Sequence, residues 1–486
     1  MGTIKKERIV KDFSKFKRII KKLINKKRFE RALCMIETAS KYMYEANQIY
    51  CDDELEDMIC NIATELLPQV KECLPESKRI LFFDGFGFDT RGLSLIYIRA
   101  LIHLGYELLL VTFTDRKGLF PTIEAEINTS GGCIQYLERD KHVKSIIELN
   151  HFIEEFKPAR LILYAYPWDS IGLAAAARYA GYMQRFLINL TDHAFWLGKQ
   201  SADYFVEFRD YGASVSYYKR GIAIDSLIKL PYYPVIDKEK PFQGFSFDLE
   251  GKKLIFSGGS LYKTLGSGNE YYHIVRHILS KHKDTIFLFA GNGDGSELKK
   301  VIGDFPQRVF WINERQDLYQ VMCHCYLYLS TYPMIGGLMS QYAVAANKVP
   351  FTLLFDDCST GTLLNQGLPG IEYYKKEEFL LEIDRCLQDL DYLRKKEKAL
   401  TGQIISSETF EKELKNTLEK HTTNLEVNVF DVQTEAFQKT YLDRLTGNSY
   451  GRIFAKKRQL FIVRYFPLPF LRGVLALLLG RKPDKH

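Results

Sequence analysis

The sequence predicts an α/β protein with two domains, each a parallel sheet between layers of helices, and three observations lead to this prediction. Short apolar runs of the length of buried strands alternate with amphipathic helical stretches over most of the 486 residues. The alternation stops at a segment rich in chain-breaking residues, 231–251, and then restarts. A hydrophobic content of 46% is enough for two substantial cores. We therefore expect two Rossmann-like domains facing a cleft, with ligands at the carboxyl ends of the strands.

The first of these domains is expected over residues 78–235. Its first strand, residues 80–83, is followed by a glycine-containing loop, 84–92, and then by a helical stretch. Further apolar runs in this part of the chain predict strands at 108–113, 161–164 and 186–190.

The second domain is expected over residues 236–400. It opens with an apolar run, 253–256, that ends in Ser257-Gly258-Gly259-Ser260, and a helix is expected over 269–281. The remaining apolar runs predict strands at 285–290, 309–312, 326–330 and 351–355. Strands that follow one another with a helix between them favour a parallel sheet, as in the first domain.

Basic residues are concentrated at the two ends of the chain. Residues 1–31 carry a net charge of +10 and residues 451–486 carry +8, whereas the whole chain carries +7. The part between the two ends is therefore near −11. This asymmetry predicts that the ends meet an anionic surface, while the acidic body argues against a nucleic-acid partner.

Residues 1–77 read as a helical N-terminal appendage. Residues 11–33 predict a basic amphipathic helix, and further helices are expected over 31–50 and 53–67. The apolar residues of the first helix recur at helical spacing; they are Phe13, Phe16, Ile20, Leu23 and Ile24.

Residues 401–486 are expected to form C-terminal helices and a basic amphipathic tail. Its apolar run, 460–479, is interrupted by Arg464 and two prolines, and its uninterrupted part is much shorter than the ~20 residues that span a bilayer. Aromatic residues between basic ones suit a segment in the lipid headgroup region. The alternative is a helix packed on the N-terminal half. The aromatic residues concerned are Phe461, Tyr465, Phe466 and Phe470.

Several classes of site are excluded by the motifs that the sequence lacks. No dinucleotide-binding G-x-G-x-x-G follows a strand, and there is neither a P-loop nor an H-E-x-x-H zinc motif. The nine cysteines form no C-x-x-C pair and indicate a reducing compartment, and the cluster 323–325 lies in a helical stretch where neighbours point apart. We expect no cofactor and no metal, with Asp356 and Asp357 belonging to a solvated loop.

A second glycine loop, residues 332–337, precedes a helical stretch and has the features of a phosphate-binding turn. Glycines at a helix start let backbone N–H groups approach a phosphate, and the helix dipole favours its negative charge. Ser340 could donate a further hydrogen bond. Close packing of the alanine-rich helix on its sheet is the alternative explanation for these small residues.

Taken in order, these segments resemble the GT-B glycosyltransferases of bacterial surface-polysaccharide and protein glycosylation. The resemblance covers roughly residues 79–400. It rests on the loop 84–92, the segment Thr191-Asp192-His193-Ala194-Phe195-Trp196-Leu197-Gly198, the loop 257–263, the strand end 289–293 and Gly336-Gly337. It implies that the C-terminal domain holds a nucleotide-sugar, expected to be UDP-linked, and that the N-terminal domain holds the acceptor.

The resemblance also assigns roles to single residues. Lys263, in the loop with Gly259 and Ser260, would offset the charge of the donor diphosphate, although a solvated lysine is the alternative. Asn313 and Arg315 would meet the nucleotide base. The loop and helix that would hold the diphosphate and sugar comprise Gly336, Gly337, Ser340 and Gln341.

The catalytic base is expected on the acceptor side. Residues 332–346 contain no carboxylate, unlike the two glutamates of many retaining members, and this favours an inverting reaction that needs a general base. His193 is the first candidate for the base, with Asp192 beside it, and a contact of His193 with the donor sugar is the alternative. Asp84 and Asp89 are further candidate bases, and the acceptor-binding residues would be Gly87, Asp89 and Arg91. Pairing of Arg91 with one of these two aspartates is the alternative.

The predicted function is transfer of a sugar from a nucleotide-sugar to a saccharide or lipid-linked acceptor in cell-surface glycan assembly. The predicted location is the cytoplasm, at the inner face of the membrane, with the basic ends on anionic lipid. Two other functions stay open on the same sequence: a nucleotide-sugar epimerase or hydrolase, and a non-catalytic membrane-associated scaffold.

Overall fold

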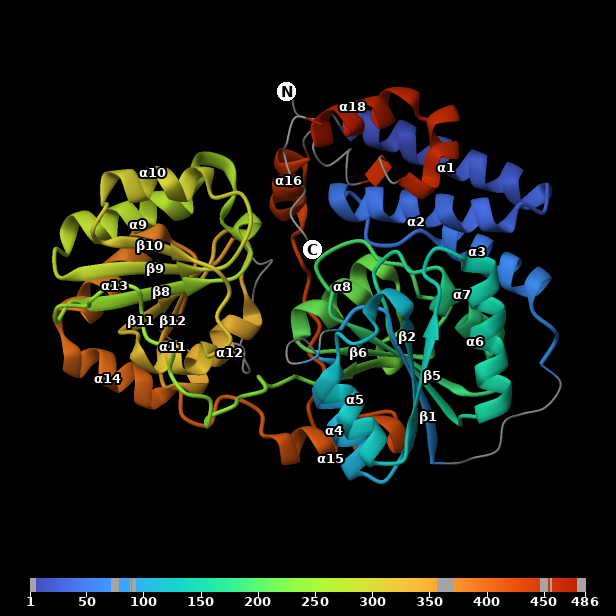
Figure 1. Ribbon diagram of the computed structural model, residues 1–486, viewed down its shortest axis with the longest axis horizontal. Coiled ribbons are helices and arrows are strands. Elements are labelled where there is room, and N and C mark those ends of the chain that lie inside the picture. Colours follow the sequence, from blue (N-terminus) through green and yellow to red (C-terminus); the bar gives the residue numbers. More distant parts are fainter. Residues whose placement is uncertain are drawn as a thin grey trace. The chain divides into compact units, whose positions relative to one another are not determined.

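The computed structural model describes residues 6–70, 78–87, 89, 93–355, 371–445, 453–454 and 457–478. The chain divides into two compact units. Unit 1 comprises the described residues of 6–232, 407–432 and 445–478, and unit 2 those of 233–406 and 433–444. Each unit contains one parallel sheet with helices, so the predicted two-domain α/β fold is confirmed (Figure 1).

The sheet of unit 1 has seven strands in the order β3-β2-β1-β4-β5-β6-β7. All neighbouring pairs are parallel, and in the central pairs Phe82 lies opposite Leu110 on one side and Ile162 on the other. The strands are β1 (Arg79–Asp84), β2 (Glu107–Phe113), β3 (Cys133–Leu137), β4 (Arg160–Tyr164), β5 (Gln184–Asn189), β6 (Tyr204–Glu207) and β7 (Leu227–Lys229). The helices that follow them are α4 (Ser94–His103), α5 (Pro121–Thr129), α6 (His142–Phe156), α7 (Ile171–Arg178), α8 (Asp210–Arg220) and, from the C-terminal part, α15 (Ser407–Lys420).

The sheet of unit 2 has six strands in the order β10-β9-β8-β11-β12-β13. They are β8 (Lys253–Gly258), β9 (Thr285–Ala290), β10 (Val309–Ile312), β11 (Leu327–Leu329), β12 (Pro350–Leu353) and β13 (Glu372–Tyr373). The helices are α9 (Glu270–Lys281), α10 (Ser296–Asp304), α11 (Leu318–His324), α12 (Gly337–Ala345), α13 (Lys376–Gln388), α14 (Leu390–Ala399) and α16 (Glu435–Arg444), with short 3-10 turns η3 (Leu261–Thr264) and η4 (Ser267–Asn269).

Alternate residues of the strands in unit 2 point into two separate cores. Ile255 and Phe287 lie in one core with residues of α9, whereas their neighbours Phe256 and Leu288 lie in the other with residues of α11. A strand whose two faces are both buried needs apolar residues at every position, since its side chains alternate. This explains the continuous apolar runs from which the strands were predicted.

The segment expected to link the domains packs on unit 2. The division between the units falls after Tyr232, close to the predicted boundary at 235. Phe242, Phe245 and Phe247 lie against the core of unit 2, and Phe247 stacks on Phe310 with ring centroids 3.9 Å apart. The segment therefore lies between the two sheets in the chain, and its aromatic residues hold it to the second one.

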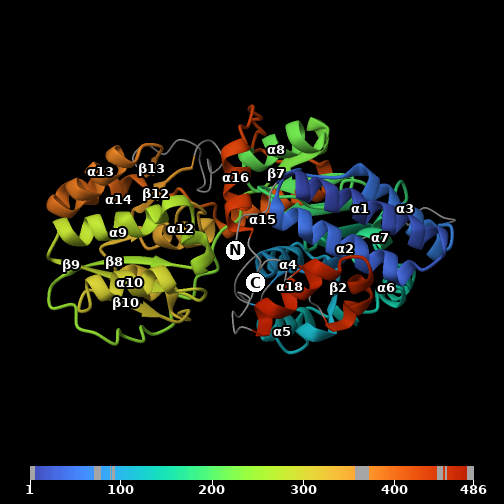
Figure 2. The same ribbon diagram turned by 90° about the horizontal axis from the view of Figure 1, so that it is seen from above.

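The three N-terminal helices are part of unit 1. They are α1 (Lys6–Asn25), α2 (Phe29–Ala46) and α3 (Asp53–Leu66). The apolar face of α1 is buried, with Phe16 and Ile20 completely inaccessible to solvent. Phe16 stacks on Phe466 with centroids 4.2 Å apart, so the two basic ends of the chain pack together, as the adjacent blue and red ribbons show (Figures 1 and 2).

The C-terminal segment forms η6 (Lys457–Arg464) and α18 (Pro467–Leu478). Ile462 and Phe466 of this region are buried, and Phe466 stacks on Phe16 of α1. Packing on the N-terminal half, one of the two alternatives above, therefore holds for this part of the tail. No helix in the described ranges combines the length and the apolar character needed to cross a membrane.

Candidate functional site

The predicted donor loops of unit 2 meet at the point where the strand order reverses. From β8 the chain first builds the sheet toward β9 and β10, and then returns to place β11 on the other side of β8. The loops after β8 and β11 therefore leave the sheet side by side and diverge, which is the usual ligand position in open α/β sheets. These loops contain Gly259 to Lys263 and Tyr332 to Gly337.

Lys263 lies next to the start of α12. The Met334 N–H donates to the Lys263 carbonyl over 3.2 Å, which ties the two loops together. The Lys263 Nζ is 3.9 Å from the place where a side chain on Gly336 would begin. Gly336 and Gly337 form the N-terminus of α12, whose unpaired N–H groups attract anions. The structure thus brings a lysine charge and a helix N-terminus to one place.

The backbones of the loops after β8 and β9 pack against each other without side chains between them. A Cβ on Gly291 would lie 1.8 Å from the Gly259 carbonyl oxygen, and Gly259 and Gly291 have φ of +120° and +154°. The Gly259 N–H donates to the Ala290 carbonyl over 3.0 Å. Only glycine fits this approach and these dihedral angles.

Other predicted donor residues are placed differently. Ser340 is fully buried and its Oγ lies 3.1 Å from the Ser330 Oγ, and Gln341 is also buried, so both lie on the sheet side of α12. Arg315 forms a bidentate pair with Asp317 at 2.6 and 2.7 Å and donates to the Gly244 carbonyl. Through these contacts Arg315 holds the 242–247 segment on unit 2, and its expected contact with the nucleotide base stays a prediction. Asn313 is exposed, and Ser260 is partly exposed at the start of η3.

A pocket within unit 2 opens beside these loops. It is lined by residues of the β8, β11 and β12 loops and by α16, which the C-terminal part of the chain contributes. Sequence reasoning did not include α16 in the site, because its helical pattern gives no sign of where the helix packs. The lining residues include Thr264, Gly266, Tyr332, Phe355 and Lys439.

In unit 1, Asp84 organises the loop after β1. It accepts hydrogen bonds from the Phe86 and Gly87 N–H groups at 2.9 and 2.6 Å and from the Ser94 Oγ at 2.6 Å. Asp84 is 1% exposed, and Arg116 lies 3.4 Å from its carboxylate. A buried carboxylate whose oxygens already accept these hydrogen bonds cannot reach an acceptor hydroxyl. Asp84 is therefore corrected from a candidate base to a residue that shapes the loop.

The remaining acceptor-side predictions have structural contacts or fall outside the described residues. A Cβ on Gly87 would lie 1.6 Å from the Ser94 Oγ, so Gly87 is needed for packing. Asp89 accepts from the Thr122 and Ile123 N–H groups at 2.9 and 3.0 Å and so caps α5. Arg91, like Asp356 and Asp357, lies outside the described residues.

His193 lies in the loop after β5, with Asp192 on its Nδ1. The His193 Nδ1 is 3.2 Å from the Asp192 Oδ1, and the His193 side chain is 26% exposed. Asn47, which caps the C-terminus of α2, donates to the His193 carbonyl over 3.0 Å and accepts from the Phe195 N–H. An Nδ1–H donated to Asp192 leaves the lone pair of a neutral imidazole on Nε2. This is the tautomer that a general base requires.

Asp192 is held by Arg209, a partner that sequence reasoning missed. The carboxylate is fully buried and accepts from the Arg209 Nε and Nη2 at 2.5 and 3.0 Å. Burial alone would raise the pKa of Asp192, but the Arg209 charge and the hydrogen bonds from His193 and Arg209 lower it to about 2. Asp192 is therefore an anion throughout the neutral range and can stabilise a protonated His193.

Further buried charges surround this pair. The Arg220 Nη2 donates to the carbonyls of Asp192 and Ala194 at 3.0 and 2.7 Å. Burial raises the pKa of Glu207 to about 7, although Arg220 and hydrogen bonds from Asn189 and Ser216 oppose the rise. Nothing in the sequence pairs these residues, because they come from β5, β6 and α8 and meet only in the folded unit.

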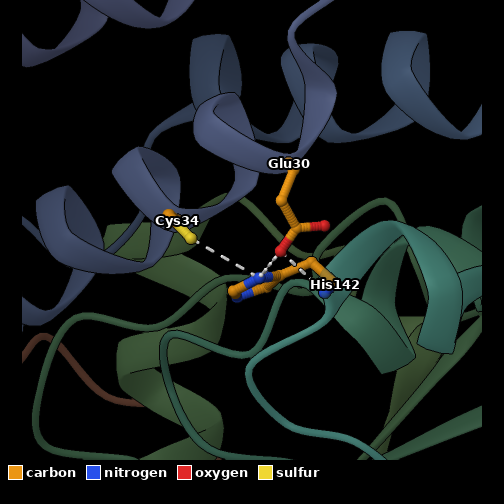
Figure 3. A group of neighbouring side chains, drawn as sticks. All are labelled: Glu30, Cys34 and His142. Atoms are coloured by element: carbon orange, nitrogen blue, oxygen red, sulfur yellow. Dashed lines mark hydrogen bonds and ion pairs between the residues drawn. The ribbon is translucent and has the colours of Figure 1, made fainter. Parts of the chain in front are cut away.

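A separate cluster in unit 1 has the side-chain chemistry of a metal site (Figure 3). The His142 Nδ1 lies 2.9 Å from the Glu30 Oε1 and 3.5 Å from the Cys34 Sγ, and its Nε2 lies 3.1 Å from the Glu37 Oε2. Glu30 also accepts from the His142 and Val143 N–H groups and thereby caps α6. Burial would lower the pKa of His142, but the two glutamates raise it far above its ordinary value. An imidazolium between two carboxylates, joining α2 to α6, accounts for these contacts.

Comparison with known proteins identifies the fold. No family model matches the sequence, and no curated protein matches it in sequence. A mutant of the O-GlcNAc transferase from Thermobaculum terrenum superposes with a TM-score of 0.54 at 13% identity, covering 89% of this chain and 84% of that one. HepE from Anabaena, in complex with UDP and glucose, superposes with a TM-score of 0.51 at 12% identity, covering 70% and 98% of the two chains.

The chain has a GT-B fold. Unit 1 and unit 2 are its two α/β halves. In this GT-B fold the Lys263–Gly336 pair lies in the C-terminal half and the Asp192–His193 pair in the N-terminal half. The three N-terminal helices pack against the N-terminal half.

Proposed function

We propose that this protein is a glycosyltransferase that moves a sugar from a nucleotide-sugar to an acceptor. The observation that carries the proposal is the position of Lys263 beside the N-terminus of α12, at the point of unit 2 where the strand order reverses. A diphosphate is the ligand that such a combination of lysine charge, helix dipole and glycine backbone favours. The comparisons support this proposal through the fold that the chain shares with HepE. One structure of HepE contains UDP and glucose, and another contains UDP-glucose.

We assign a role in the proposed reaction to the candidate residues of each unit. The acceptor hydroxyl oxygen attacks the anomeric carbon as the bond from that carbon to the diphosphate oxygen breaks, and the nucleoside diphosphate leaves with the electron pair. Lys263 and the α12 N-terminus offset the charge that develops on the leaving group. His193 takes the hydroxyl proton, and Asp192 stabilises the imidazolium that forms.

The finer parts of the proposal come from the resemblance to GT-B glycosyltransferases. The donor is UDP-linked, the reaction inverts the anomeric centre, and no metal takes part. The acceptor is a saccharide or a lipid-linked saccharide of a bacterial surface glycan, and the enzyme works at the inner face of the cell membrane. The absence of a carboxylate in residues 332–346 supports inversion, since an inverting reaction relies on the acceptor-side base instead.

Binding of UDP tests the donor site. Isothermal titration of the full chain with UDP should give saturable binding, and Lys263→Met should weaken it by at least about tenfold because a charge-assisted contact is lost. Lys299→Met is the matched control, since Lys299 is an exposed lysine of α10 in the same unit. Equal weakening in both variants, or undiminished binding by Lys263→Met, would remove the proposed diphosphate site.

Activity tests the role of His193. With UDP-sugars and a panel of lipid-linked and free saccharides, UDP release should require the acceptor, and His193→Asn should lower kcat at least about a hundredfold without weakening UDP binding. His151→Asn, an exposed histidine of α6, is the control. Acceptor-independent UDP release would indicate hydrolysis, interconversion of the UDP-sugar would indicate an epimerase, and binding without turnover would indicate a scaffold.

A further inference from the structure

Helix α18 exposes a row of leucines at the surface of unit 1. Leu468, Leu471, Leu475 and Leu478 are 65%, 54%, 53% and 76% exposed. Their spacing of three and four residues places them on one face of the helix. Single exposed leucines are common on protein surfaces, whereas a contiguous row marks a surface that binds something.

The segment before this helix fixes its orientation. Ile462 and Phe466 are buried, and Phe466 stacks on Phe16 of α1. Within α18, Pro469 and Gly473 are buried on the side opposite to the leucines. The helix is therefore anchored to the N-terminal helices by one side and presents the other to solvent.

A basic stripe on α1 borders the same segment. Lys11, Lys15, Arg18 and Lys22 are spaced four, three and four residues apart and so share one face of α1. The Lys15 amine donates to the Tyr465 carbonyl and lies 4.6 Å from the centre of the Phe466 ring, which places the stripe alongside the C-terminal segment.

Most of the charge on this stripe is available to a ligand. Lys11, Arg18 and Lys22 are exposed and form no ion pair with any residue within the described ranges. By contrast, Lys17 and Lys21, on another side of the helix, are both paired with Glu54. Arg472 adds an exposed positive charge to α18 itself.

We propose that this surface docks on an anionic lipid bilayer, with the leucines of α18 at the acyl boundary and the basic stripe of α1 near the headgroups. An apolar face beside Lys and Arg residues is the composition of an interfacial membrane helix. The charge favours lipid over a second copy of the chain, because a symmetric contact would bring two basic stripes together. The proposal does not depend on the glycosyltransferase activity.

The proposed docking surface changes which residues we expect to enter the membrane. The basic end that contains residues 11–33 was expected to dock on anionic lipid, but the apolar residues of its helix, among them Phe13, Phe16 and Ile20, lie in the core of unit 1. Phe466, also expected among the headgroups, is buried. Helix α1 contributes only charge, and the insertion falls to the leucines of α18, which the sequence analysis did not single out.

Vesicle co-sedimentation of the full chain tests the proposal with point variants, because deletion of the tail would expose Phe16. The protein should bind phosphatidylcholine vesicles containing phosphatidylglycerol at least about tenfold more tightly than vesicles of phosphatidylcholine alone. The variant Leu468→Ser/Leu471→Ser/Leu475→Ser should lose at least about tenfold in binding. The matched control is Leu119→Ser/Leu381→Ser/Leu390→Ser, which changes three exposed leucines elsewhere.

Reversing the charge of the basic stripe separates its contribution to vesicle binding from that of the leucines. Lys11→Glu/Arg18→Glu/Lys22→Glu should abolish the preference for phosphatidylglycerol, whereas Lys299→Glu/Lys300→Glu on α10 should preserve it. Circular dichroism and the melting temperature confirm that each variant is folded. Undiminished vesicle binding by the leucine variant, or equal binding of the wild type to both vesicle types, would overturn the proposal. The proposal would also be overturned if the wild type bound no vesicles and formed a dimer that the leucine substitutions abolish. A second copy of the chain would then cover the leucines.

Discussion

At the scale of single residues, the position of His193 depends on a chain of buried contacts. Asp192 accepts from His193 on one side and from Arg209 on the other, and Arg220 holds the backbone of the same loop. Arg209 therefore acts as a positioning residue, because it keeps Asp192 ionised and fixed beside His193. A buried carboxylate that lost this partner would be costly, at about 3–5 kcal/mol.

The ionisation of Asp192 makes stability dependent on pH in the acid range. The folded-state pKa, about 2, lies below the value of 3.8 expected in the unfolded chain. The contribution is therefore present above about pH 4 and is lost as the pH falls toward 2, with a size of about 2 kcal/mol. Urea unfolding at pH 6 and pH 3 should show this loss in the wild type and a smaller one in Asp192→Asn. An equal loss in both proteins would mean that other carboxylates account for it.

At the scale of elements, the N-terminal helices complete the loops of the sheet beneath them. Glu56 of α3 accepts from the N–H groups of Gly198, Lys199 and Gln200. Asn47 holds both sides of His193 in the same way, and Glu30 caps α6. Helices that satisfy buried backbone groups of a domain belong to that domain. The contacts of Asn47, Glu30 and Glu56 therefore make α2 and α3 part of unit 1, and Asn47 supports the His193 loop although it was not predicted there.

The paired glycine loops of unit 2 give a prediction at the same scale. Gly291→Ala would place a Cβ 1.8 Å from the Gly259 carbonyl oxygen, so the loops after β8 and β9 must move apart. We expect a loss of about 1–3 kcal/mol in the free energy of unfolding and weaker UDP binding. Both are measurable by denaturant titration and calorimetry.

Gly303→Ala is the control for this prediction. Gly303 lies in α10, and apart from its chain neighbours and the nearby backbone of the helix itself no atom lies within 4 Å of its added Cβ. Since alanine has the higher helix propensity, this variant should be as stable as the wild type or up to about 1 kcal/mol more stable, and it should bind UDP normally. Normal UDP binding by Gly291→Ala would show that the loop contact is irrelevant to the donor.

At the scale of the whole molecule, two units with separate sheets and cores imply two cooperative transitions. The proposed donor site lies entirely in unit 2, so UDP should stabilise that unit by mass action and leave unit 1 unchanged. Scanning calorimetry should show two transitions, of which only one moves to higher temperature with UDP. A single transition that moves as a whole would show that the units unfold together.

The sequence by itself determined the elements in which every position is apolar. The runs that became β1, β2, β8 and β9 were predicted to within one or two residues, because strands buried on both faces leave continuous apolar patterns. Four strands were missed, and each has a reason. The residues of β3 (Cys133–Leu137), at the edge of the sheet, alternate in exposure and so leave no continuous apolar run. The other three strands have four residues or fewer, too few to give a clear pattern; they are β6 (Tyr204–Glu207), β7 (Leu227–Lys229) and β13 (Glu372–Tyr373).

For the candidate site, the sequence indicated the glycine loops and the Asp192–His193 pair, since glycine spacing and neighbouring residues are local properties. Only the tertiary structure decided that Lys263 meets Gly336, that Arg209 pairs with Asp192, and that Arg315 pairs with Asp317. It also decided that α1 buries its apolar face while α18 exposes leucines. An amphipathic pattern shows that one face needs an apolar neighbour, but whether protein or lipid supplies that neighbour depends on contacts between residues hundreds of positions apart.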